Sequence, residues 1–212
     1  MAYPNPLFPV GTPFDYCNTG YFLLSIIIES VSRQSYKEFA QQSIFKPLQM
    51  DNNFIVGSYP VHTTIARGYR ENNTCGYQLS ESLWTQTGDG AVHSNVLDLM
   101  KWGKNDTSGK VGGKALVEKM LQALPARNRI GKAIEHHQKY AYGIIISQHF
   151  GITHFEHSWG WAGWATYFLR LPDLGLTVAV LANVEDLDTQ KMAYEITDII
   201  LTQSTEFHDD HD

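Results

Sequence analysis

The last third of the chain constrains the fold most, because its apolar residues come in runs typical of β-strands. The runs cover Tyr140 to His149, Thr153 to His157, Ala165 to Leu171 and Leu176 to Asn183, with glycine-containing turns between them. The segment Pro172-Asp173-Leu174-Gly175 is typical of a hairpin turn. Because strands that follow one another across short turns pair antiparallel, we expect a mostly antiparallel sheet.

A helix is predicted to cover this sheet. Asp188 is a suitable N-cap for a helix from Thr189 to Thr202. The sheet-facing side of this helix is expected to be an apolar stripe with helical spacing, formed by Met192, Ile196, Ile199 and Ile200. The charged tail from Glu206 to Asp212 is expected to be disordered.

The first part of the chain is predicted to be helical. An almost unbroken apolar run from Tyr21 to Val31, with Asn18 or Thr19 as its cap, favours a helix that is buried on most of its faces. Ser35 begins a capping box for a second helix, Tyr36 to Ile44.

The middle of the chain alternates between loops and helices. Residues 50–87 are expected to form short strands and surface loops. A helix is expected from Asn95 to Lys104, and a linker, Asn105 to Gly113, precedes another helix that ends near Leu124. Helices followed by antiparallel strands and a covering helix predict an α+β fold in one domain, residues 1–205.

The composition excludes several classes of function. A formal net charge of -6 without a basic stripe argues against nucleic acid as a partner. The longest apolar stretch, Tyr21 to Ile28, is far shorter than the roughly 20 residues that span a bilayer. The N-terminus shows no signal peptide. Cys17 and Cys75 lack metal-ligand spacing, and His154 and His157 are expected on opposite faces of a strand, so we expect no metal and no cofactor.

Two short segments carry candidate chemistry. Tyr16 and Asn18 place a phenol and a carboxamide two residues apart, just before a helix. The segment from His157 to Trp164 comes at the end of a predicted strand and opens a turn rich in glycine and tryptophan, where backbone N–H groups can approach a ligand. Each segment also has a structural interpretation, because Tyr16 can be a packing residue, Asn18 a helix cap and the tryptophans a cover for the core.

The order of the motifs resembles the serine β-lactamase and penicillin-binding-protein superfamily, in particular its class C-like branch. The resemblance extends roughly from Pro9 to Ile200 and implies a β-lactamase/transpeptidase-like fold. It rests on Tyr16-x-Asn18, Phe45-Lys46-Pro47-Leu48-Gln49-Met50, Gly88-Asp89-Gly90, Asp98-Leu99-Met100-Lys101-Trp102, His157-Ser158-x-Gly160 and Arg170-Leu171-Pro172-Asp173.

The resemblance implies roles for particular residues. In this superfamily a Ser-x-x-Lys helix supplies the nucleophile and an amine, a Tyr-x-Asn loop moves a proton and orients the substrate, and a Lys-Thr-Gly or His-x-Gly strand lines the opposite wall. Tyr16, Asn18 and His157 are thus implied to be catalytic. The residues implied to bind substrate are Ser158, Trp159 and Gly160, with Trp159 where the family usually has glycine.

The first motif has no counterpart in its usual place. The only Ser-x-x-Lys in the chain, Ser43 to Lys46, lies after Tyr16, whereas the superfamily has this motif before Tyr-x-Asn. We do not expect Ser43 to be the nucleophile. The chain is therefore expected to be the C-terminal portion of such a protein, with an incomplete fold, no activity alone, and exposed apolar surface that promotes self-association.

The implied substrates are β-lactams, D-amino acid peptides or small esters, which would be hydrolysed or transferred through an acyl-enzyme. The alternative is a non-catalytic ligand-binding or scaffold member of the same fold. In that case Trp159, Trp161 and Trp164 would suit stacking against a ligand.

Overall fold

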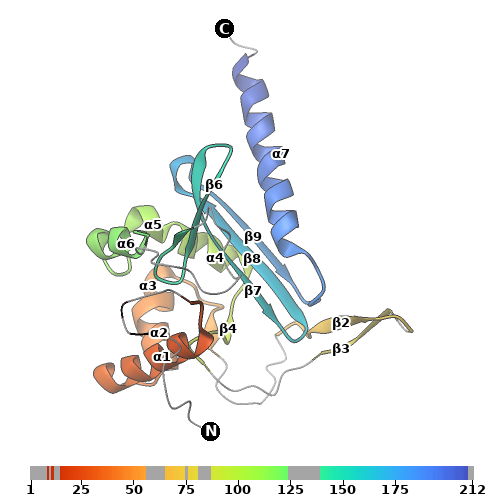
Figure 1. Ribbon diagram of the computed structural model, residues 1–212. Helices are drawn as coiled ribbons and strands as arrows, with labels where there is room; N and C mark the ends of the chain where they lie inside the picture. Colours follow the sequence, from red (N-terminus) through yellow and green to blue (C-terminus); the bar gives the residue numbers. More distant parts are fainter. Residues whose placement is uncertain are drawn as a thin grey trace.

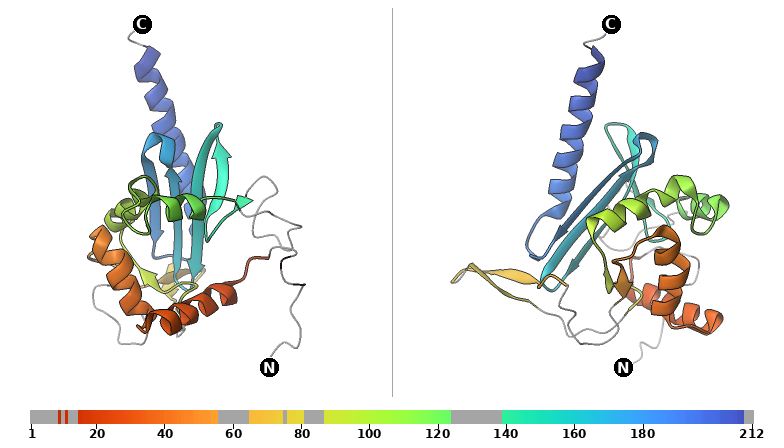
Figure 2. Two further views of the ribbon diagram at one scale, coloured as in Figure 1. Left: turned by 90° about the vertical axis from the view of Figure 1, so that its left-hand side faces the viewer. Right: turned by 180° about the vertical axis from the view of Figure 1, so that it is seen from behind.

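The computed structural model describes residues 9, 11, 15–55, 65–74, 76–80, 87–123 and 139–209, with backbone alone from residue 204 onward. The described elements form three layers (Figure 1). The largest sheet lies in the middle, helix α7 covers one of its faces, and the shorter helices gather on the other face (Figure 2). This arrangement confirms the predicted α+β class.

The central sheet is built from consecutive strands. Its order is β5-β6-β7-β8-β9 and every neighbouring pair is antiparallel. The strands are β5 (Lys139–Tyr140), β6 (Ile145–His149), β7 (Ile152–Trp161), β8 (Trp164–Leu171) and β9 (Leu176–Ala182). The predicted hairpin turn is a 3-10 turn, Pro172–Leu174, followed by Gly175 in the left-handed region. The meander predicted from the sequence is thus confirmed.

Strand β7 is longer than predicted. The sequence predicted that His157 ends a strand, but pairing with β8 continues to Trp161, opposite Trp164. The glycine and tryptophan segment therefore forms strand rather than turn, because its residues alternate between the two faces of the sheet. His154 and Glu156 lie on the face of α7, because both hydrogen-bond to Tyr194 of that helix, and residue 158 shares this face. Residues 157, 159 and 161 lie on the opposite face.

Helix α7, Thr189–Asp209, packs through a different side than predicted. Ala193 and Thr197 are fully buried against the sheet. The stripe expected to cover the sheet is instead partly exposed, at Met192, Ile196, Ile199 and Ile200. Small side chains let a helix approach a sheet closely, and α7 therefore turns the side with Ala193 and Thr197 toward the sheet. Asp188 accepts a hydrogen bond from the Lys191 N–H, which confirms the predicted cap. The helix continues beyond its predicted end at Thr202.

Helix α1, Asn18–Ser32, also differs from expectation. Its N-cap is Cys17, without a side-chain capping bond, so the predicted cap at Asn18 or Thr19 is wrong. The prediction of burial on most faces is wrong as well, because Leu23 is 52%, Ile27 54% and Val31 79% exposed. About half or more of each of these three side chains is thus left exposed. The apolar run therefore marks an uncovered surface.

The segment after α1 shows the effect of Pro47. Helix α2, Tyr36–Ala40, begins with the predicted Ser35 capping box and passes into a π-helical turn η1, Gln41–Phe45, and then α3, Lys46–Leu48. Proline has no N–H to donate to the carbonyl four residues earlier, and its ring collides with that carbonyl in a regular α-helix. The wider π-turn accommodates it, with the Lys46 N–H donating to the Gln41 carbonyl.

The remaining elements are short. They comprise β1 (Phe54–Ile55) paired with β4 (Val92–His93), the hairpin β2 (Tyr69–Asn72) and β3 (Gly76–Leu79), and the helices α4 (Val96–Gly103), α5 (Asn105–Ser108) and α6 (Lys114–Met120). Helix α5 occupies part of the predicted linker. A buried, bidentate ion pair joins it to β8, with Arg170 donating to both oxygens of Asp106 at 2.8 and 3.1 Å.

Candidate functional site

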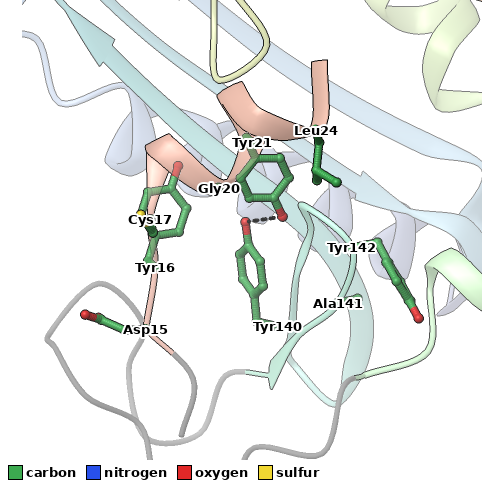
Figure 3. Close-up of a pocket in the computed structure, with 9 residues that line it drawn as sticks. All are labelled: Asp15, Tyr16, Cys17, Gly20, Tyr21, Leu24, Tyr140, Ala141 and Tyr142. Carbon is green, nitrogen blue, oxygen red and sulfur yellow. Dashed lines mark hydrogen bonds between the residues drawn. The ribbon is translucent and has the colours of Figure 1, made fainter. Parts of the chain in front are cut away.

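Three tyrosines from two distant parts of the chain meet at one pocket. Tyr16 precedes α1, Tyr21 lies in the first turns of α1, and Tyr140 ends β5 (Figure 3). The pocket has a volume of about 390 Å³ and is lined by Asp15, Tyr16, Cys17, Gly20, Tyr21, Leu24, Tyr140, Ala141 and Tyr142. It lies where the start of α1 approaches the β5 edge of the sheet.

His157 lies beside this cluster. The ring centroids of Tyr16 and His157 are 6.0 Å apart, and Tyr140 lies edge-on to Tyr16 at the same distance. The Tyr140 hydroxyl is 3.5 Å from Nε2 of His157 and 3.3 Å from the Tyr21 hydroxyl. The fold thus brings together two residues that are 141 positions apart in the chain.

Burial controls the electrostatics of the phenols. The pKa of Tyr16 is raised, first by burial and then by neighbouring Tyr21 and Asp89. The pKa of Tyr140 is raised strongly, again mainly by burial and then by its hydrogen bond with Tyr21. Both phenols are therefore protonated at neutral pH. Tyr16 is not by itself a base in this environment.

Trp159 lies next to His157 on the same face of β7. Its ring stacks on Trp161 with 5.9 Å between centroids and 13° between planes. A Cβ atom on Gly90 would lie 2.6 Å from a carbon of the Trp159 ring, so the Gly88 to Gly90 turn packs directly on the indole. The other side of this turn meets α1, because a Cβ on Gly88 would lie 2.5 Å from the Ser25 hydroxyl oxygen.

Of the predicted site residues, Tyr16 belongs to the pocket lining, whereas His157, Trp159 and the remaining ones lie outside it. Asn18 is exposed at the first position of α1. Ser158 belongs to the opposite face of β7 from His157, and its carbonyl accepts a hydrogen bond of 2.7 Å from Nδ1 of His157. Gly160 is exposed. Ser43 is exposed in the π-turn and is also outside the pocket lining.

Sequence reasoning missed Tyr21 and Tyr140. Tyr140 was noticed only as the start of a β-rich run, and Tyr21 only as part of an apolar helix. The spacing of Tyr16 and Tyr21 places both near the start of α1, which is the one local signal that could have drawn attention to Tyr21. Nothing in the sequence indicated the contact between Tyr21 and Tyr140, because it depends on the packing of the helix against the sheet edge.

An antiparallel sheet between a C-terminal helix and a set of shorter helices is the architecture of the β-lactamase/transpeptidase fold. The family model described as Beta-lactamase matches residues 1–200, and the chain belongs to this family.

Several relatives support this assignment. The chain is 30% identical to penicillin-binding protein 4* of Bacillus subtilis, over 82% of this chain and 40% of the relative. It is 23% identical to a D-aminopeptidase of Gluconobacter oxydans, over 83% and 32% of the two chains. The structure of an octameric penicillin-binding protein homologue from Pyrococcus abyssi superposes with a TM-score of 0.79 at 28% identity, over 91% of this chain and 43% of that one.

The chain spans less than half the length of these relatives. Among the helices of the described residues, none is long and apolar enough to cross a bilayer.

Proposed function

We propose that this chain supplies two walls of a serine hydrolase site that acts through an acyl-enzyme. The observation that carries the proposal is the contact between Tyr16 and His157, the residues aligned by the resemblance with the second and third motifs of the family. The family match and the named relatives, a penicillin-binding protein and a D-aminopeptidase, support substrates with an amide or ester carbonyl. β-Lactams, D-amino acid peptides and small esters belong to this class.

The proposed chemistry transfers an acyl group to a serine. The serine oxygen bonds to the carbonyl carbon, the bond from that carbon to the leaving amine or alkoxide breaks, and the serine proton passes to the leaving group. Water then attacks the ester and releases the acid and the serine. Tyr16 is proposed to carry the proton, while Asn18 and the strand from His157 to Gly160 orient the substrate.

The raised pKa of Tyr16 supports the proposal that this chain does not react alone. Tyr16 can accept the serine proton only as a phenolate, and a phenolate is populated near neutral pH only when a nearby cation lowers the pKa of the phenol. The family supplies this cation as the lysine of Ser-x-x-Lys, and the sole match in these residues, Ser43 to Lys46, lies outside the pocket lining. We propose that activity requires a Ser-x-x-Lys motif beyond these residues.

Covalent labelling tests this proposal. The chain should give no adduct when it is incubated with a fluorescent penicillin or with a p-nitrophenyl ester, as measured by gel fluorescence and intact mass. A relative with all three motifs serves as the positive control. An adduct that peptide mapping assigns to Ser43, and that Ser43→Ala abolishes, would overturn the proposed site.

The stacked pair of Trp159 and Trp161 favours a second candidate function, a non-catalytic member that binds ligands by stacking. This alternative predicts that a D-amino acid amide quenches tryptophan fluorescence saturably. Trp159→Leu should then weaken binding, whereas a change at the exposed Tyr77 of the β2–β3 hairpin should not.

A further inference from the structure

Tyr140 links two residues of the candidate site that come from different layers of the molecule. Its side chain is only 6% exposed, although its hydroxyl lies between Tyr21 of α1 and His157 of β7. Its ring is perpendicular to that of Tyr16, and it lies 6.3 Å from the His157 ring. Tyr140 therefore contacts His157, Tyr16 and Tyr21 at once.

The surroundings of His157 determine where its hydrogen lies. Nδ1 is 2.7 Å from the carbonyl oxygen of Ser158, and a carbonyl can only accept. Nδ1 must therefore carry the hydrogen. In a neutral imidazole the other nitrogen, Nε2, then has a lone pair and no hydrogen. The Tyr140 hydroxyl is the group beside Nε2, so it donates its hydrogen to this nitrogen. Because a hydroxyl has only one hydrogen, the Tyr21 hydroxyl then donates to the Tyr140 oxygen.

We propose that Tyr140 is a positioning residue: its hydroxyl occupies the Nε2 lone pair of His157 and holds the neutral imidazole as the Nδ1–H tautomer beside Tyr16. This inference rests on the proposed function, because that function makes His157 a wall of the acyl-transfer site. It assigns His157 an orienting role in that wall. With Nε2 occupied by Tyr140, His157 orients its neighbours and is not the general base, so proton transfer is left to Tyr16.

Nitrogen NMR of the full 15N-labelled chain tests the inference under conditions where the imidazole is neutral. Long-range proton–nitrogen correlations should show His157 with its hydrogen on Nδ1. In Tyr140→Phe the ring remains but the donor is lost, so the Nε2 resonance should move downfield toward that of a lone pair without a donor. A purely structural role of the Tyr140 ring would not move this resonance.

Two further variants make the test specific. Tyr142→Phe changes an exposed tyrosine of the same pocket and should leave the His157 resonances unchanged. Tyr21→Phe removes the donor to Tyr140 and should give a smaller shift in the same direction, which keeps the test available if Tyr140→Phe does not fold.

A hydrogen on Nε2 of wild-type His157, or an Nε2 resonance unaffected by both Tyr21→Phe and Tyr140→Phe, would overturn the inference. The readout does not depend on turnover. An adduct at Ser43 would remove the proposed function and leave the tautomer result standing.

Discussion

At the scale of single residues, Gly163 is a position where an added side chain would collide with backbone atoms. It follows β7 with a φ of +82°, and an added Cβ would lie 2.4 Å from the Ser80 carbonyl oxygen and 2.6 Å from Cα of Gly68. Its N–H also donates to Glu185 at 2.5 Å. The β2–β3 hairpin therefore reaches the sheet through a direct contact between backbones, for which only glycine leaves room.

We expect Gly163→Ala to lower the free energy of unfolding by about 2–5 kcal/mol, which combines the left-handed backbone penalty with overpacking. Urea denaturation measures this loss. Gly175→Ala is the matched control, because Gly175 also has a positive φ, +63°, but nothing within 4 Å of its added Cβ. The control should lose about 1 kcal/mol. Equal losses for the two variants would show that the close backbone contact is not important.

At the scale of elements, α7 is attached to the sheet by a buried polar cluster. Glu156 of β7 is 1% exposed and accepts hydrogen bonds from Tyr167 of β8 at 2.5 Å and Tyr194 of α7 at 2.7 Å. Nε2 of His154 lies 3.1 Å from the same carboxylate. Burial works to raise the pKa of Glu156, but the hydrogen bonds from His154, Tyr167 and Tyr194 lower it further than burial raises it, so the net pKa lies below 4.5.

This cluster predicts a pH-dependent effect of Glu156→Gln. Because the pKa of Glu156 is lower in the folded state, its stabilisation is complete above pH 4.5 and is lost as the pH falls toward the folded value. We expect the variant to lose about 2 kcal/mol at neutral pH. The difference from wild type should shrink below pH 4.5. Thermal unfolding over this pH range measures it, and a difference that grows in acid would contradict the assigned ionisation.

The comparison of sequence and structure is also clearest at this scale. The order of the sheet was predictable, because β6 to β9 are linked by short turns and each strand pairs with the next. The side of α7 that packs on the sheet was not predictable, because Ala193 and Thr197 are buried there in place of the larger apolar residues. The pairing of Tyr16 with His157 was implied by resemblance alone. Tyr140 was missed because its partners come from two other elements.

At the scale of the whole molecule, large apolar side chains of the described residues are exposed on two helices, α1 and α7. Leu23, Ile27 and Val31 lie four residues apart on one side of α1, and Ile196, Ile199 and Ile200 are partly exposed on α7. Large exposed apolar patches mark interaction surfaces. The exposed sides of α1 and α7 are therefore candidate interaction surfaces.

We therefore expect the chain to self-associate through the exposed side of α1. Light scattering coupled to size-exclusion chromatography should show a mass that rises with concentration. Leu23→Lys combined with Ile27→Lys should shift the distribution toward monomer, because both charges would be buried at the contact. Gln42→Lys with Asn73→Lys adds the same charge at exposed positions outside α1 and is the control. A wild-type chain that stays monomeric at high concentration would contradict the expectation.

The consecutive order of the strands has a consequence for folding kinetics. Each pairing from β5 to β9 closes only a short loop, whereas the contact between Tyr21 and Tyr140 spans 119 positions. Short loops cost little entropy to close, so the meander is favoured to form before α1 docks. The tyrosine pocket is then completed late, after the sheet edge that carries Tyr140 already exists. Interactions that form after the rate-limiting step slow unfolding more than they speed folding. The contacts of the tyrosine pocket would therefore mainly lower the unfolding rate.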